Sequence, residues 1–425
     1  MSRISLLLLA LTANAQNNID LVTQVPLSSF SLTSTQGAGI WGFSDPANRE
    51  YAIMCTDGGT AVFDITNPVS PVEIGMVAPL NANPDKEVQI YVFDDDPFIA
   101  YAYVAHPGSG GGLQIIDLSN VPVSIAEVTP NWCPGFLGFT EATNVALGVK
   151  PSGFIGFVQG SNQSAGVFAV DISNPTGPCD LGSWDVAFTY DLFLSSNWYD
   201  LNFDGMELGV AFTGTSFYVI DLSDFYDLDP MTNSATTIGG YTPPTGLTDC
   251  RTGWMSRDGR YLFTSDQGDE PLGSNTAVRV FDMSDVTSPT LIETWTGPTQ
   301  AIDHQVTVFQ DFAFLANGTR GMVVLDATDP TTLQLQGDYD TFPANNAAQL
   351  DGAWESFFLN LTGIIATSDR SGGLFLLDPV LPTDICRTLD VGNDGFDLND
   401  LALLYPNWTS SETVLTLSGL ITTCL

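Results

Sequence analysis

Basic residues are scarce in this chain. It has 11 lysines and arginines against 49 aspartates and glutamates in 425 residues, a formal net charge of −38 at pH 7. A surface of this sign repels the phosphates of nucleic acids and of anionic membranes, so we expect neither as a partner. It suits a salty or calcium-rich exterior, where cations screen the repulsion. We interpret the charge as a solvated surface rather than as a binding site.

Histidines and the short motifs of common enzymes are also missing. The chain has two histidines and contains no G-x-S-x-G, P-loop, C-x-x-C or H-E-x-x-H pattern. These patterns supply an exposed serine nucleophile, a phosphate cradle, a redox dithiol and a zinc-binding pair, respectively. Their absence weighs against the corresponding enzyme classes and favours a binding or structural role.

Long apolar runs are absent after the N-terminus. Met1-Ser2-Arg3 is followed by an apolar stretch over 4–11 and by Ala13-Asn14-Ala15, which has the small-x-small pattern of a cleavage site. This order predicts a secretory signal peptide over 1–15, a secreted or cell-surface location and a mature chain that starts at Gln16. The run is too short to span a bilayer, and no later segment approaches that length. The alternative interpretation is a buried N-terminal helix.

What the chain has in abundance is one repeated phrase, a run of apolar β-formers ending in aspartate. It occurs seven times, ending at Asp64, Asp117, Asp171, Asp221, Asp282, Asp326 and Asp378. Such a run between turn residues predicts a buried strand, and the aspartate can accept hydrogen bonds from N–H groups two or three residues later. The spacing of about fifty residues is typical of a four-stranded propeller blade.

The ends of the repeat predict how the ring closes. After Asp378 the sequence contains no outer strand, whereas 19–27 (IDLVTQVPL) resembles the outer strands that follow the other copies. We therefore predict an all-β, seven-bladed propeller of four-stranded blades over 16–380, closed by an N-terminal outer strand that would remove two exposed sheet edges at once. A small C-terminal tail occupies 381–425.

Six cysteines in a secreted chain favour disulfides. We predict one bond between Cys386 and Cys424, which flank the tail. A second pair is Cys133 with Cys179, near outer strands of neighbouring blades, whereas Cys55 and Cys250 are candidates for free thiols. The glycosylation sequons begin at Asn162, Asn317, Asn360 and Asn407, with a weaker N-x-C form at Asn131.

The repeated strand-plus-aspartate phrase resembles the LVIVD repeat, and the order of blades is similar to the secreted choice-of-anchor B family. The most specific stretches are 41–54, 252–270, 301–326 and 352–378, and the resemblance covers about 20–380. It implies an exported propeller with interchangeable C-terminal anchors and no defined molecular function. An Ala/Ser-His-Asn phrase often starts inner strands in that family. This chain keeps only Asp303-His304-Gln305 and has Thr143-Asn144 and Tyr190-Asp191 at corresponding places, so a role built on several histidines is in doubt.

The tail over 390–408 resembles half of a dockerin, an EF-hand-like calcium loop that leads into a helix. Candidate calcium ligands are Asp390, Asp394, Asp397 and Asp400. The loop departs from the standard pattern, since Gly392 replaces a ligand and Asp400 arrives one residue early. The alternative is an Asx-rich turn before a short helix.

Several candidate sites lie within the predicted ring. Asp303 and His304 could face the central channel beside Arg320 and Arg370, with His304 as a base or as a structural residue. Asp266, Asp269 and Glu270 cluster in one loop and are a second candidate calcium site. Trp254 and Trp354 are core residues or, alternatively, a stacking platform for sugars.

Two functions follow from these readings. The first is a secreted, non-catalytic binding or structural propeller that engages an extracellular protein or glycan and is presented through its tail. The second is a propeller hydrolase or lyase on an anionic or carbohydrate substrate, with His304 as base and a bound cation. The scarcity of histidine favours the first, although propellers as a fold host both.

Overall fold

The computed structural model describes residues 18–92, 99–150, 153–195, 206–226, 234–242, 247–379 and 381. The chain divides into two compact units, 1–379 and 380–425. The predicted signal peptide, the Cys386–Cys424 bond, the dockerin-like ligands Asp390, Asp394, Asp397 and Asp400, and the sequon at Asn407 all lie outside the described residues.

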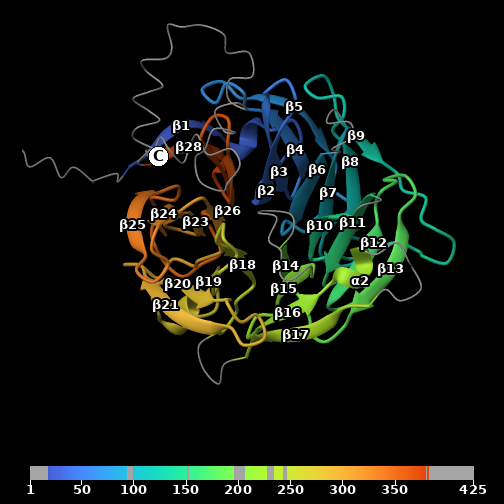
Figure 1. The fold of residues 1–425 in the computed structure, drawn as a ribbon. Coiled ribbons are helices and arrows are strands. Elements are labelled where there is room, and N and C mark those ends of the chain that lie inside the picture. The colour runs from blue at the N-terminus through green and yellow to red at the C-terminus, as the bar shows by residue number, and fades with distance from the viewer. Residues whose placement is uncertain are drawn as a thin grey trace, which may run out of the picture. The chain divides into compact units, whose positions relative to one another are not determined.

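The strands of the described residues form seven four-stranded antiparallel sheets, arranged as the blades of a ring (Figure 1). In blades one to six the strands run in chain order from the inside outwards. Blades one to three are β2 (Gly37–Ser44), β3 (Glu50–Thr56), β4 (Gly59–Asp64), β5 (Val72–Val77); β6 (Glu87–Val92), β7 (Ala100–His106), β8 (Gly112–Asp117), β9 (Ala126–Val128); β10 (Asn144–Lys150), β11 (Gly153–Gln159), β12 (Val167–Asp171), β13 (Cys179–Trp184).

Blades four to six continue the pattern. They are β14 (Asp191–Leu194), β15 (Leu208–Phe212), β16 (Phe217–Asp221), β17 (Thr236–Tyr241); β18 (Thr252–Met255), β19 (Tyr261–Ser265), β20 (Ala277–Asp282), β21 (Thr290–Thr296); β22 (Gln305–Phe309), β23 (Phe312–Asn317), β24 (Gly321–Asp326), β25 (Gln334–Tyr339). The described helices are short, namely η1 (Leu27–Ser29), α2 (Ser223–Tyr226) and η2 (Glu270–Leu272). None of the helices in this part of the chain is long and apolar enough to cross a membrane.

The seventh blade joins the two ends of the ring. Its inner strands are β26 (Ala353–Leu359), β27 (Ile364–Asp369) and β28 (Gly373–Pro379), and its outer strand is β1 (Ile19–Val25). Strand β1 pairs antiparallel with β28, from Ile19 opposite Pro379 to Val25 opposite Leu374. The predicted closure is therefore confirmed, and Figure 1 shows the N-terminal strand beside the C-terminal one.

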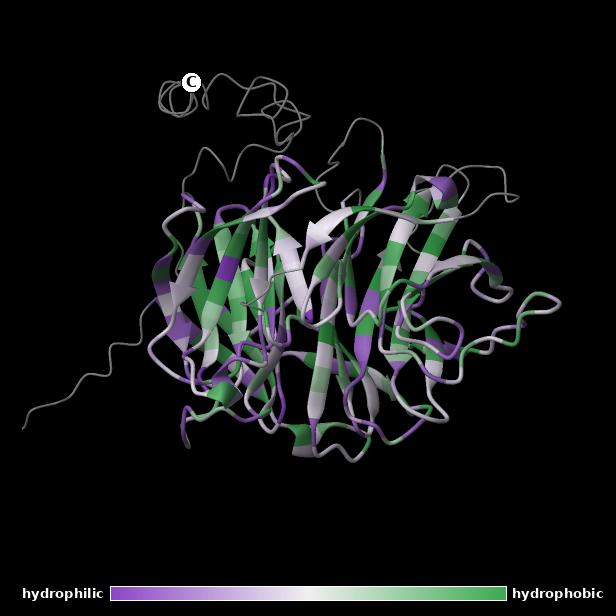
Figure 2. Cartoon of the chain, turned by 90° about the horizontal axis from the view of Figure 1, so that it is seen from below, coloured by the Kyte–Doolittle hydropathy of each residue, from purple (hydrophilic) through white to green (hydrophobic). Residues whose placement is uncertain are grey.

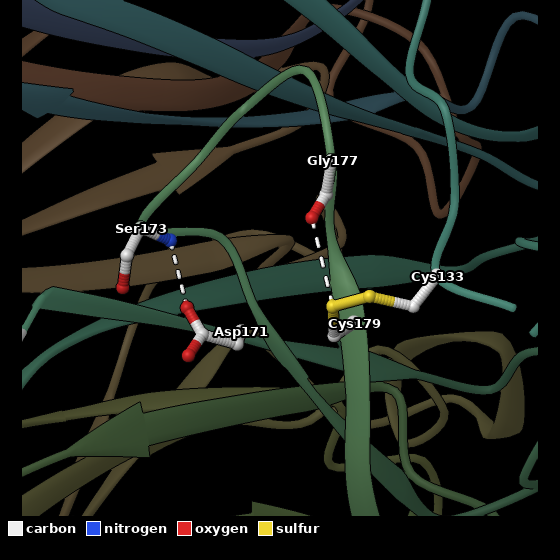
Figure 3. Close-up of a disulfide and its surroundings, with 5 residues drawn as sticks. All are labelled: Cys133, Asp171, Ser173, Gly177 and Cys179. Carbon is white, nitrogen blue, oxygen red and sulfur yellow. Dashed lines mark hydrogen bonds between the residues drawn. A yellow bond between two sulfur atoms is a disulfide. The ribbon is translucent and has the colours of Figure 1, made fainter.

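The repeated phrase forms the third strand of each blade, as predicted. In six copies the aspartate accepts a hydrogen bond of 2.8–3.0 Å from the N–H two residues later: Thr66, Ser119, Ser173, Ser223, Ser284 and Thr328. Figure 3 shows this bond between Asp171 and Ser173. The bond fixes the turn towards the outer strand.

Apolar contacts between adjacent blades make up the core. One cluster joins Phe63 of blade one to Leu374 and Leu376 of blade seven, and all three are buried. Outer strands contribute through a β-bulge, because the extra residue at Ile74, Leu181, Ile238 or Ile292 packs against such a cluster. In Figure 2 the hydrophobic colour follows the strands.

Cys133 and Cys179 form a disulfide, which confirms the second predicted pair (Figure 3). The bond links the segment after β9 to the start of β13, and Asn131 and Cys133 also donate backbone hydrogen bonds to Thr176 and Pro178. It therefore fastens blade two to blade three. Cys55 and Cys250 are free and buried.

Candidate functional site

Polar side chains stand at or near the beginning of the inner strands. Six blades each contribute one to the central channel: Glu87, Asn144, Asp191, Thr252, Gln305 and Glu355. Blade one instead places Gly39 beside Glu87, where an added Cβ would lie 2.6 Å from Glu87 Oε2. The six side chains, which we call the polar ring, line a cavity of about 290 Å³.

The mouth of the cavity is lined by the residues that precede five of the six members of the polar ring. In five blades these are Thr143, Tyr190, Arg251, His304 and Trp354. Loop residues that include Asp85, Phe188 and Leu350 complete the mouth. Two consecutive positions of a strand point to different sides, so one position forms the mouth and the next forms the ring below it.

Aromatic side chains crowd the channel below the polar ring. Trp41 lies 4.9 Å from Phe357 and 6.3 Å from Trp254, and Phe193 lies 5.3 Å from Trp254, measured between ring centroids. They come from strands β2, β26, β18 and β14. We call these four residues the aromatic floor, because they narrow the channel beneath the cavity.

Carboxyl groups dominate the electrostatics of the polar ring. Burial raises the pKa of Glu87 to about 7, and the carboxyl of Glu355 lies within hydrogen-bonding reach of it. The pKa of Glu355 is raised well above its usual value by burial and by the charge of Glu87, and burial also raises that of Asp191. Two carboxyl groups in contact cannot both ionise easily, so we expect Glu87 and Glu355 to share a proton near neutral pH.

Two arginines stand at the mouth, each held by an acid and an aromatic ring. Arg251 pairs with Asp249 at 2.7 Å and lies 4.6 Å from the centre of the Tyr190 ring. Arg370 pairs with Asp85 at 2.6 Å and lies 4.2 Å from the centre of the Trp354 ring. The cavity thus has a mixed-charge mouth above an acidic interior.

Comparison with known protein families now adds one finding. Residues 100–128, 162–186 and 303–341 match the model of the LVIVD repeat. The chain carries LVIVD repeats. The matched stretches include motif strands of blades two, three and six and, in the last stretch, all of blade six from Asp303 onwards. No curated protein matches the sequence.

The Asp303-His304 pair of the third LVIVD match is split between two environments. His304 lines the mouth, its ring centroid lies 3.7 Å from that of Trp354, and burial lowers its pKa to about 3. The expectation that Asp303 also faces the channel is wrong. Its carboxylate is fully buried in blade five, where it accepts hydrogen bonds from the N–H groups of Asp266 and Ala277 at 2.8 and 3.0 Å.

The acidic loop of blade five does not form the predicted calcium site. Asp266 accepts bonds from the backbone of Thr248 and Asp249, and Asp269 pairs with Arg279 at 2.6 Å. Across the described ranges, no three or more His, Cys, Asp or Glu side chains are placed to hold a metal ion. Burial and the charge of Asp269 raise the pKa of Glu270 to about 8 instead. Local structure therefore engages Asp266 and Asp269, whereas both carboxyl oxygens of Glu270 are buried without a hydrogen-bond partner among the described residues.

The remaining candidates separate by position. Arg320 is buried and pairs with Asp338 at 2.9 Å, so the expectation that it lies beside His304 at the channel is wrong. Arg370 is at the mouth, because it pairs with Asp85, a residue that lines the cavity. Trp354 lines the mouth of the cavity, and Trp254 belongs to the aromatic floor.

The sequons also separate by position. Asn162 and Asn360 are exposed, but the sequon at Asn317 is a wrong prediction, because its side chain is fully buried and bonded to Thr276 and Ala301. A glycan could not be attached there in the folded chain.

The polar ring as a whole was not predicted, although a signal for it exists. The inner strands begin with a polar residue followed by apolar ones, as in EVQI, NVAL, DLFL and QVTV. Thr143-Asn144 and Tyr190-Asp191 mark two of these positions. In the Ala/Ser-His-Asn phrase the histidine is the middle residue, whereas the third position supplies the side chain that enters the polar ring.

Proposed function

We propose that the protein is a secreted or cell-surface propeller that binds an extracellular ligand without transforming it, in the cavity above the polar ring. One observation carries the proposal. Six blades each place one polar side chain around a single space of about 290 Å³, with the aromatic floor beneath. A concave site with a few convergent polar groups is the usual form of a small-ligand pocket.

The arrangement of the candidate catalytic residues supports a binding role over hydrolysis or elimination. A general base needs a pKa near the working pH and a group that orients it. Burial instead lowers the pKa of His304 to about 3, and Asp303 is engaged by the backbone of blade five. The metal-assisted alternative has no set of ligands within the part of the chain that the structure describes.

Export and presentation complete the proposal. The signal-like segment over 1–15 and the resemblance to choice-of-anchor B proteins support a secreted chain whose tail over 381–425 tethers the ring. Expression of the full chain in a secreting host should yield a mature protein that begins at Gln16, as read by N-terminal sequencing. A variant that ends at residue 380 should be exported and bind ligand, but should be lost from the cell surface or assembly.

The binding proposal is tested with a glycan, polymer and metabolite array run with and without calcium. Leu350→Trp narrows the mouth, and Leu361→Trp, at the other end of β26, is its matched control, because the two leucines are 54% and 53% exposed. A ligand should bind the wild type and the control, and at least ten-fold more weakly the Leu350→Trp variant. Equal binding to all three proteins would place the ligand elsewhere on the ring and contradict the proposal.

A further inference from the structure

The three carboxyl groups of the polar ring differ in how well they are satisfied. Asp191 accepts hydrogen bonds from Asn144, Thr252 and the N–H of Leu192 at 2.8–2.9 Å. Glu355 accepts one from the N–H of Ile40 at 2.7 Å and one from Gln305 at 2.5 Å. Glu87 accepts a hydrogen bond from the indole N–H of Trp354, at the long distance of 3.5 Å. Glu87 is therefore the carboxyl group with capacity left for a ligand.

The polar ring also lacks a counter-charge of its own. The basic side chains around it are used elsewhere, since Arg251 pairs with Asp249 and Arg370 with Asp85. Lys86 is fully buried but donates to the carbonyls of Thr56 and Asn83. Among the described residues, no basic side chain forms an ion pair with Glu87, Asp191 or Glu355. Partly buried carboxylates without such a partner attract a cation strongly, because little water screens them.

A separate observation at the mouth also points to a missing donor. The Nδ1 atom of His304 is buried and has no hydrogen-bond partner among the described residues. Burial keeps this imidazole neutral, so one ring nitrogen is an acceptor. His304, Glu87 and Glu355 line the same cavity. An incoming group that carries several N–H donors would satisfy the carboxyl acceptors of the polar ring, and also His304 Nδ1 once the imidazole turns toward the cavity.

The aromatic walls argue against a stacked sugar. Trp354 is contacted by His304 and Arg370, and Tyr190 by Arg251 and Phe188, whose ring centroid lies 4.9 Å away. A sugar ring would have to displace one of these neighbours before it could stack. The carboxyl groups of the polar ring are therefore better placed to contact a ligand than the aromatic faces are.

On the basis of the proposed binding function, we propose that the cavity takes a small organic cation whose primary ammonium group sits between Glu87 and Glu355. The ammonium has three N–H donors and no acceptor, which matches the acceptors of the two carboxylates. When it binds, the proton shared by Glu87 and Glu355 leaves to solvent, and the cation takes its place. A space of about 290 Å³ corresponds to roughly ten waters, enough for a short-chain amine.

The test is calorimetric titration of the full mature chain at pH 8 with putrescine, with 1,4-butanediol as the neutral analogue. Putrescine should bind and the diol should not. Glu87→Gln should weaken putrescine at least ten-fold. Glu293→Gln, the same change on outer strand β21, should leave the affinity within two-fold. Thermal melts show that each variant is folded, and Glu355→Gln serves as a second ring variant. At pH 6.5, titration in buffers of different ionisation enthalpy should show protons released on binding.

Several outcomes would overturn the inference. These are equal binding of putrescine and the diol, unchanged affinity in both Glu87→Gln and Glu355→Gln, and binding of calcium chloride but not putrescine in a Glu87-dependent way. If putrescine does not bind but an array ligand is lost in Leu350→Trp, the cation inference fails and the binding function stands. If no ligand depends on Leu350, the binding function itself fails.

Discussion

Two positions of each blade differ in how much their residue type varies around the ring: the end of the third strand is nearly constant, and the beginning of the first strand is not. The third strand carries an aspartate at or next to its end in all seven blades, and in six of them this aspartate accepts the same hydrogen bond from the residue two positions later. The first strand begins with a different residue in nearly every blade, from Glu87 and Asn144 to Asp191 and Thr252. The repeated position builds each blade, whereas the varied position builds one shared cavity.

The difference shows where a repeat protein has room for a specific site. A motif that fixes a local turn works in every copy, so nothing is gained by varying it. At the channel, the seven copies meet around one axis and face each other. Seven identical charged side chains would therefore place like charges in contact. The polar ring avoids this in part by mixing amides, a hydroxyl and carboxyl groups.

Removal of the closing strand should have the largest effect and should break both regions at once. Deleting residues 16–30 removes β1 and η1, exposes the edge of β28 and uncovers part of the cluster around Phe63. We expect the melting temperature to fall by more than about 10 °C, or cooperative melting to be lost, in calorimetry. A truncated protein that melts like the wild type would show that β1 is not needed for closure.

Asp303→Ala should have the second-largest effect on stability, because it removes a buried structural carboxyl group that does not line the cavity. The N–H groups of Asp266 and Ala277 would lose their acceptor inside blade five. We expect unfolding to become easier by roughly 2–4 kcal/mol, measured by denaturant titration. Ligand affinity should not change. His304→Ala is the matched comparison, with a cost of about 1 kcal/mol but weaker ligand binding.

Glu87→Gln should change the pH dependence of stability. The pKa of Glu87 is raised from 4.5 to about 7 in the folded chain, where Glu355, Asp191 and Asp85 face it. The folded state therefore holds this proton more tightly than the unfolded state, so its contribution is full below pH 4.5 and is lost as the pH rises to 7. We expect the variant to gain melting temperature relative to wild type at pH 8 but not at pH 4.5. A pH-independent difference would mean that no proton is shared.

Asp117→Ala should have the smallest effect and should sharpen the contrast with the polar ring. It removes the bond from the N–H of Ser119 at a half-buried position, so the cost should be about 1 kcal/mol. Asp171→Ala in the next blade should cost the same, since its bond to Ser173 is equivalent. Ligand affinity should be unchanged in both. A loss of binding would show that the motif positions also shape the cavity.

Much of the fold could be predicted because its signals are local. Apolar runs ending in aspartate located the third strands, and the missing outer strand after Asp378 pointed to β1. Strand boundaries are harder to predict. The apolar pattern of blade two extends back to Val123, but Val123 donates its N–H to the carbonyl of Asn120 in a turn and β9 begins only at Ala126. Turn chemistry there competes with strand pairing over a few residues, and the sequence pattern alone does not decide between them.

The sequence by itself determined the number of blades, the Asx turns and the closure of the ring, because each depends on a repeat or on residues close in the chain. Only the tertiary structure decided which polar residues meet. Asp303 and His304 are neighbours in sequence but point into blade five and into the cavity. Glu87 and Glu355 come from blades two and seven, yet their carboxyl groups lie within hydrogen-bonding reach of each other. Contacts around the central axis depend on the curvature of the whole ring, to which every blade contributes and which no single stretch encodes.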